Sequence, residues 1–145
     1  MTETLVEAVR QIESSGGRFV VGDGGRARGP WQMHAAAWKD VTTLRAHNGM
    51  PTWNYIHAYE PAVARLYARD YLTILENQLR NTLRREPTAE LIYAAYNVGF
   101  ARLESLGFRL ERVPRTTRAA CARLAPLLVE IERTSERFLV QSEAN

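Results

Sequence analysis

The chain has 145 residues, 46% of them hydrophobic and 24% charged, a balance typical of one folded domain and not of a disordered chain. The net charge is only +3, and the arginines are scattered among glutamates without interleaved aromatic residues, so we expect no nucleic-acid surface. No run of about 18 uncharged apolar residues occurs, and the first dozen residues carry several charges, so neither a membrane span nor a signal peptide is expected.

The sequence favours neither a disulfide nor a metal site. Cys121 is the only cysteine, and we expect it to pack on a helix. The three histidines are His34, His47 and His57, and they match none of the short helical spacings of zinc ligands. We therefore expect a single domain over residues 1–145 that is a monomer and needs no metal or other cofactor.

The first predicted helix spans residues 2–14 and carries a carboxylate near its end. Apolar residues recur on one face at helical spacing: Leu5, Val9 and Ile12. Glu13 lies beside this face, and Gly16 and Gly17 end the helix. A carboxyl group that is partly desolvated there, with no Lys or Arg in the next four residues, is expected to have a raised pKa. It would then keep its proton near neutral pH, as a general acid must.

A small β-hairpin is predicted at residues 18–28. An apolar run at 19–21 is followed by the turn residues Gly22–Gly25 and a possible return strand at 26–28. Asp23 in this turn is either a turn residue or a second carboxylate for catalysis. Gly29–Pro30 is expected to open a second helix at 30–40, since proline is favoured at a first helical position, and this helix would bring Gln32 back towards Glu13.

The rest of the chain reads as mainly helical. Residues 44–60 are irregular, with a turn at 48–51, and Trp53 and Tyr55 there belong either to a cleft wall or to the core. A long central helix is expected from Pro61 to about Arg84, a shorter one from Pro87–Thr88 to Gly99, and a third at 100–106. The last helical region runs from Pro114 to about Phe138, kinked or split at Pro126, with an inward stripe of apolar residues: Leu124, Leu127, Leu128, Ile131 and Phe138.

Three short motifs in chain order resemble those of the soluble lytic transglycosylases, the goose-type-lysozyme-like family that cleaves peptidoglycan. They are Glu13-Ser14, Gly29-x-x-Gln32-Met33 and Ala95-Tyr96-Asn97-x-Gly99. The segment Pro114-x-x-Thr117 is similar to one that follows these motifs in the family, and Gly29–Met33 also resembles a stretch of the invertebrate-type lysozymes. The resemblance spans about residues 5–120 and implies a mainly α, lysozyme-like fold: a helical bundle around a long central helix, with one small hairpin.

The resemblance also implies an activity. Lytic transglycosylases cleave the β-1,4 bond between N-acetylmuramic acid (MurNAc) and N-acetylglucosamine (GlcNAc) in the glycan strands, and leave 1,6-anhydro-MurNAc ends. Glu13 would be the single general acid and base. Substrate-binding roles are implied for five further residues: Ser14, Gln32, Met33, Tyr96 and Asn97. The family tyrosine, here Tyr96, has its hydroxyl close to the catalytic glutamate; Asn97 either binds substrate or caps its helix, and Met33 lines the pocket floor.

Two other functions stay open. A hydrolytic muramidase would use Glu13 together with Asp23, because hydrolysis needs a second carboxylate. A non-catalytic protein that binds the cell wall, or serves as an assembly scaffold, would keep the fold without the chemistry. In each case the expected partner is peptidoglycan, in the periplasm or at the extracellular cell wall, reached by export or by release on lysis.

Overall fold

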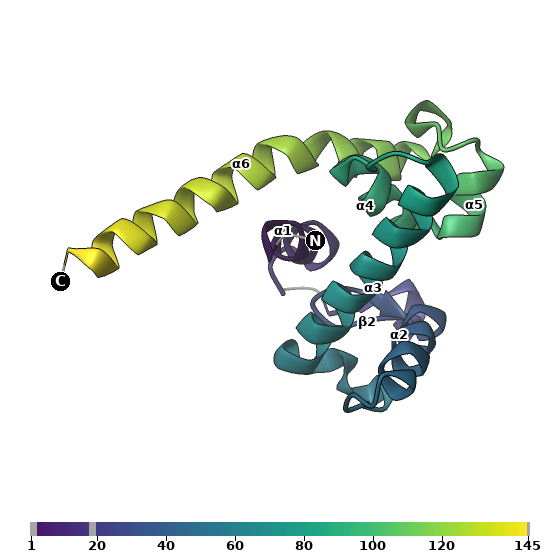
Figure 1. Cartoon of the computed structure of the whole chain (residues 1–145), viewed down its shortest axis with the longest axis horizontal. Coiled ribbons are helices and arrows are strands. Elements are labelled where there is room, and N and C mark those ends of the chain that lie inside the picture. The colour runs from purple at the N-terminus through teal and green to yellow at the C-terminus, as the bar shows by residue number, and fades with distance from the viewer. Residues whose placement is uncertain (1–2, 18–19, 145) are drawn as a thin grey trace.

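The computed structural model describes residues 3–17 and 20–144 of the chain. Within these residues the chain forms six α-helices and one three-stranded antiparallel sheet (Figure 1). The coarse prediction of a mainly helical protein with a small β element is therefore confirmed. Residue 2 of the first predicted helix and residues 18 and 19 of the predicted hairpin lie outside the described residues.

The first helix, α1, spans Glu3–Ser14 and lies at the centre of the molecule, packed between α3 and α6 (Figure 1). The predicted apolar stripe faces the core, where Leu5 is 3% and Val9 0% exposed. Removing such side chains from water stabilises the fold by about 1.5–3 kcal/mol each. Because this helix is held on two sides, the residues at its last turn have fixed positions.

The sheet has strand order β1-β2-β3 and consists of two-residue strands. They are β1 at Val21–Gly22, β2 at Ala27–Arg28 and β3 at Met33–His34. Val21 pairs with Arg28 and Ala27 pairs with His34, both in antiparallel register. The predicted hairpin is thus present within its described part, and a third strand that the sequence did not predict extends it.

The predicted helix at 30–40 is wrong at its start, because residues 29–32 form a turn that leads into β3. Gly29 has φ +79° and Gln32 has φ +47°, both in the left-handed region. A Cβ atom at Gly29 would lie 1.7 Å from the carbonyl oxygen of Ala58, so the chain can pass here only as glycine. The preference of Pro30 for a first helical turn is overridden by these contacts, and helix α2 begins only at Ala35 and ends at His47.

The central helices match their predictions closely. Helix α3 spans Pro61–Leu83, α4 spans Ala89–Val98 and α5 spans Phe100–Ser105. The Thr88 hydroxyl caps α4 by accepting a hydrogen bond from the Leu91 amide, at 3.2 Å. Gly99, at φ +90°, separates α4 from α5. Short 3₁₀ segments lie at Tyr55–Tyr59 and Leu110–Arg112.

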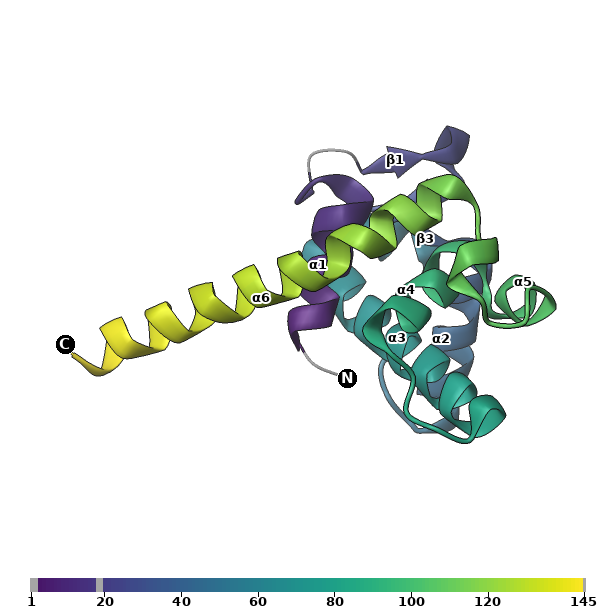
Figure 2. The same cartoon turned by 90° about the horizontal axis from the view of Figure 1, so that it is seen from above.

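The last helix, α6, spans Arg115–Glu143 as one unbroken element of 29 residues that contains Pro126. Its first half packs on α4 and α1 and buries Cys121 and Leu124. Its outer half leaves the domain (Figures 1 and 2). Phe138 is 75% exposed, so its predicted place in a packed stripe is wrong. None of the helices in the described ranges combines the length and the apolar character that crossing a bilayer requires.

Candidate active site

Glu13 lies in the last turn of α1, and its carboxylate faces α4. The Tyr93 hydroxyl donates a hydrogen bond to Glu13 Oε1 at 2.9 Å, and Asn97 Nδ2 approaches the same oxygen at 3.5 Å. Tyr93 and Asn97 are one turn apart on α4, so their side chains emerge from the same face. Within residues 3–17 and 20–144 both donors reach Oε1, and Oε2 receives no hydrogen bond.

Burial raises the pKa of the Glu13 carboxyl, as the sequence predicted. The hydrogen bonds from Tyr93 and Asn97 stabilise the ionised form and partly offset this effect. Two weaker influences come from the facing wall, where His34 lowers the pKa and Asp23 raises it. Burial is the largest of these causes, so Glu13 keeps its proton to higher pH than an exposed glutamate does.

A hollow of about 230 Å³ lies in front of Glu13. Its wall includes Asp23 and Ala27 from the sheet region and Asn97 from α4. A second hollow of about 270 Å³ adjoins it, and the two share four lining residues: Gln32, His34, Tyr96 and Asn97. Together they form a cleft between the sheet, α2 and α4, with Glu13 in one of its two parts.

Trp53 and Tyr55 do not line either hollow, and both pack against the core. The Tyr55 hydroxyl donates to the backbone oxygens of Arg26 and Met33, at 2.8 and 2.6 Å, and so braces the sheet from behind. Of the two roles considered for these aromatic residues, the structure assigns the one in the core.

Tyr96 lies in the cleft, but its hydroxyl does not contact Glu13. It donates to the backbone oxygen of Trp31 at 2.6 Å, while its ring lines both hollows. The hydroxyl contact that the family resemblance implied for Tyr96 is made instead by Tyr93, which the sequence reasoning missed. Burial and the nearby Glu13 raise the Tyr93 pKa far above its usual range, so this phenol remains a hydrogen-bond donor. The available signal was its position one helical turn before Asn97.

Thr117 fixes the orientation of the Asn97 side chain. Its hydroxyl donates to Asn97 Oδ1 at 2.6 Å, and the threonine is only 2% exposed. With the amide oxygen held in this way, the amide nitrogen points towards Glu13. Thr117 was not among the predicted site residues, although it closes the Pro114-x-x-Thr117 segment that carries part of the resemblance.

Gln32 and Met33 reach the cleft from the turn and from β3. The left-handed backbone of Gln32 lets its side chain fold over Gly22, where an added Cβ would lie 2.1 Å from Gln32 Oε1. Its Nε2 donates to the Gly29 oxygen at 2.9 Å, and the residue lines both hollows. Met33 is 2% exposed and lines the second hollow.

Ser14 has a structural role that corrects the substrate-binding role expected from the sequence. It is only 1% exposed. Its hydroxyl contacts the backbone oxygens of Pro30 and Arg10, at 2.5 and 3.0 Å, and accepts a hydrogen bond from the Gly17 amide at 2.9 Å. The residue therefore ties the end of α1 to the turn before β3, and this tie helps to hold Glu13 and Gln32 on facing walls.

Asp23 lies at the rim of the hollow that contains Glu13. Its carboxylate is 3.4 Å from His34 Nε2, and the two side chains are 67% and 53% exposed. Its backbone is left-handed at φ +50°, followed by Gly24 at φ +63°, as a tight turn requires. Asp23 is thus both a turn residue and a carboxylate that faces the cleft.

The chain matches no protein-family model, no curated protein and no solved structure. Among the described residues, no three His, Cys, Asp or Glu side chains gather as ligands for a metal ion.

Proposed function

We propose that this chain is a lysozyme-like lytic transglycosylase that cleaves peptidoglycan strands at the MurNAc-β-1,4-GlcNAc bond. The observation that carries the proposal is Glu13, a carboxyl group with a raised pKa in a polar cleft, held through one oxygen by Tyr93 and Asn97. The three motifs of the resemblance support it, since they supply Glu13, Gln32, Tyr96 and Asn97 around one cleft. The proposed substrate lies outside the cytoplasm, at the cell wall.

The hydrogen bonds indicate which oxygen carries the catalytic proton. Oε1 accepts from Tyr93 and Asn97, so the proton of the neutral acid belongs on Oε2. In the proposed reaction Oε2 gives this proton to the glycosidic oxygen, and the bond from C1 of MurNAc to that oxygen breaks. The resulting carboxylate then takes the proton of the C6 hydroxyl as O6 bonds to C1. Glu13 ends protonated again, and no water is consumed.

Hydrolysis is the second candidate, and the position of Asp23 is the observation that favours it. Asp23 lines the same hollow as Glu13, where a second carboxylate would activate water on the other side of the sugar. The Asp23 carboxylate is more exposed to solvent than Glu13 and already contacts His34, so it is less well placed than Glu13 to act as a catalytic group. We therefore rank hydrolysis second.

Mass spectrometry of digested peptidoglycan separates the two reactions. We expect 1,6-anhydro-MurNAc ends from the wild-type chain, no cleavage by Glu13→Gln, and unchanged products from Asp23→Asn. Glu7→Gln is the matched control, because Glu7 lies on the same helix and pairs with Arg10 away from the cleft. Reducing ends that disappear in Asp23→Asn would establish hydrolysis instead. Full cleavage by Glu13→Gln would refute both, and wall binding without cleavage by the wild type would leave the scaffold function.

A further inference from the structure

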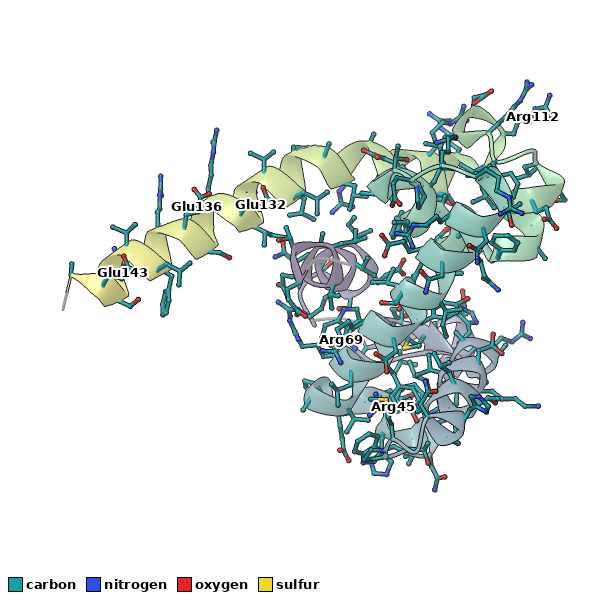
Figure 3. The ribbon with its side chains drawn as sticks, in the orientation of Figure 1. Arg45, Arg69, Arg112, Glu132, Glu136 and Glu143 are labelled. Atoms are coloured by element: carbon teal, nitrogen blue, oxygen red, sulfur yellow. The ribbon has the colours of Figure 1, made fainter. Side chains whose placement is uncertain are left out.

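The outer half of α6, residues 127–143, leaves its own domain. Leu127, Leu128 and Ile131 still pack against the core, whereas residues 132–143 are all exposed. This exposed part continues the helix away from α1 for about 18 Å (Figures 1 and 2). Its side chains, among them Glu132, Glu136 and Glu143, stand away from the rest of the domain (Figure 3). Phe138 and Leu139 are 75% and 62% exposed. A solitary helix of this length is marginally stable in water, and its apolar residues require a covering surface.

A groove lies where this half of α6 leaves α1. It has a volume of about 630 Å³, larger than either hollow of the cleft that holds Glu13, and it is separate from that cleft. Leu127, Ile131, Phe138 and Leu139 of α6 form its apolar wall, and Glu7 and Gln11 of α1 form a polar one. An apolar wall beside a polar one is the kind of lining that receives an amphipathic helix.

We propose that the occupant is the same half of α6 from a second copy of the chain, in an antiparallel, two-fold pair. Four of the residues that line the groove follow the alternating spacing of a helix–helix seam: Leu127, Ile131, Thr134 and Phe138. A two-fold pair is self-complementary, so one surface supplies both sides of the contact. This inference is independent of the proposed catalytic function, and it departs from the monomer that the sequence led us to expect.

Charge complementarity supports this partner and sets the register. When Phe138 of one copy packs against Leu127 of the other, Ile131 meets Thr134, and Glu130 lies beside Arg137 of the other copy. Symmetry makes each of these contacts twice. Within the described ranges of one chain, neither the Glu130 carboxylate nor the Arg137 guanidinium forms an ion pair, so both are available across the interface. A parallel pair would place Glu130 beside the uncharged Ser135 of the other copy instead, and this ion pair would not form.

Sedimentation equilibrium of the full chain, from about 1 to 100 μM, tests the proposal. We expect a monomer–dimer equilibrium that Phe138→Asp weakens by about tenfold or more. Val140→Asp is the matched control: Val140 is 66% exposed on the same helix, but two residues from Phe138 and hence on the opposite face. This control should leave the dissociation constant within about twofold of the wild-type value.

A charge exchange tests the register itself. Glu130→Arg places two arginines together in each symmetric contact and should weaken the dimer, whereas the double variant Glu130→Arg/Arg137→Glu should restore it. Circular dichroism checks that the domain stays helical, which is expected because these side chains are on the protein surface. A wild type that is monomeric over the whole range would overturn the proposal. Equal effects of Phe138→Asp and Val140→Asp, or no restoration in the double variant, would also overturn it.

Discussion

Replacing Tyr93 by phenylalanine isolates the hydroxyl group that touches the candidate catalytic acid. The change removes the 2.9 Å hydrogen bond to Glu13 Oε1 and keeps the ring that fills the core, where Tyr93 is only 1% exposed. Burial raises the Glu13 pKa, and the Tyr93 hydroxyl opposes that rise by stabilising the carboxylate. The pKa of the Glu13 carboxyl should therefore be higher in Tyr93→Phe than in the wild type.

The size of the effect follows from the hydrogen bond. A hydrogen bond to a charged group contributes about 1.5–3 kcal/mol, and each 1.36 kcal/mol corresponds to one pH unit. Asn97 approaches the same oxygen at 3.5 Å and compensates in part. We therefore expect the titration midpoint of Glu13 to rise by about one pH unit. The alkaline limb of wall cleavage, which reports loss of the proton from the acid, should move up by the same amount.

Carbon-13 NMR of the Glu13 carboxyl carbon measures this midpoint whether or not the chain is an enzyme. Tyr71→Phe is a suitable control, because Tyr71 lines the adjoining hollow and is not among the groups that influence the Glu13 pKa. A midpoint that stays in place or falls in Tyr93→Phe would refute the assignment of Tyr93 as the group that stabilises the carboxylate. Movement of the NMR midpoint without movement of the activity limb would instead show that Glu13 is not the acid.

Three further predictions concern the site and the turn beside it. Because the Glu13 pKa is raised in the folded state, the free energy of unfolding falls as the pH rises above 4.5, the usual pKa of a glutamate. Glu13→Gln carries no ionisable group here, so in urea unfolding it should be more stable than the wild type at pH 7 and equally stable at pH 4. Gly29→Ala should lower the free energy of unfolding in urea by about 3 kcal/mol, because the added Cβ would meet the backbone oxygen of Ala58. Gly49→Ala should lower it by only about 1 kcal/mol, because Gly49 is also left-handed but lies in open space. Thr117→Val should release the Asn97 amide, slow wall cleavage about tenfold and shift the alkaline limb of the pH–activity profile to higher pH. Thr117→Ser, which keeps the hydroxyl, should behave like the wild type. Unchanged cleavage by Thr117→Val would refute this positioning role.

The sequence predicts those parts of the fold that depend on local periodicity. Helices α1, α3 and α4 appear near their expected bounds, because each has an apolar face at helical spacing. The sequence does not predict the turn at residues 29–32, because its left-handed backbone depends on contacts with other segments. Gly29 passes close to the backbone of Ala58, and the Gln32 side chain lies over Gly22. The sequence also places Phe138 in the packed stripe of α6, although the structure leaves it exposed. An apolar stripe predicts a buried face but does not show which surface covers it.

In the candidate site, too, local sequence predicts some features, and others depend on how the helices pack. Glu13 and its raised pKa followed from the position of one carboxylate beside an apolar helix face. The exchange of roles between Tyr93 and Tyr96 did not follow, because both tyrosines lie on α4 and only the rotation of α4 against α1 decides which hydroxyl meets the carboxylate. Motif spacing fixes which residues approach the cleft, and the packing of the helices fixes the hydrogen bonds that they form.

Helix α6 is expected to serve the two proposed roles independently, through its two ends. Its inner end holds Thr117 against Asn97, whereas Phe138 lies almost six turns further along the helix and outside the domain. The residues between them that pack on the core, Cys121 and Leu124 above all, anchor the inner end without help from a second chain. Loss of the dimer should thus leave the carboxylate and its donors in place, and loss of Glu13 should leave the seam of α6 intact. A monomeric chain would therefore refute only the dimer, and full cleavage by Glu13→Gln would refute only the catalytic function.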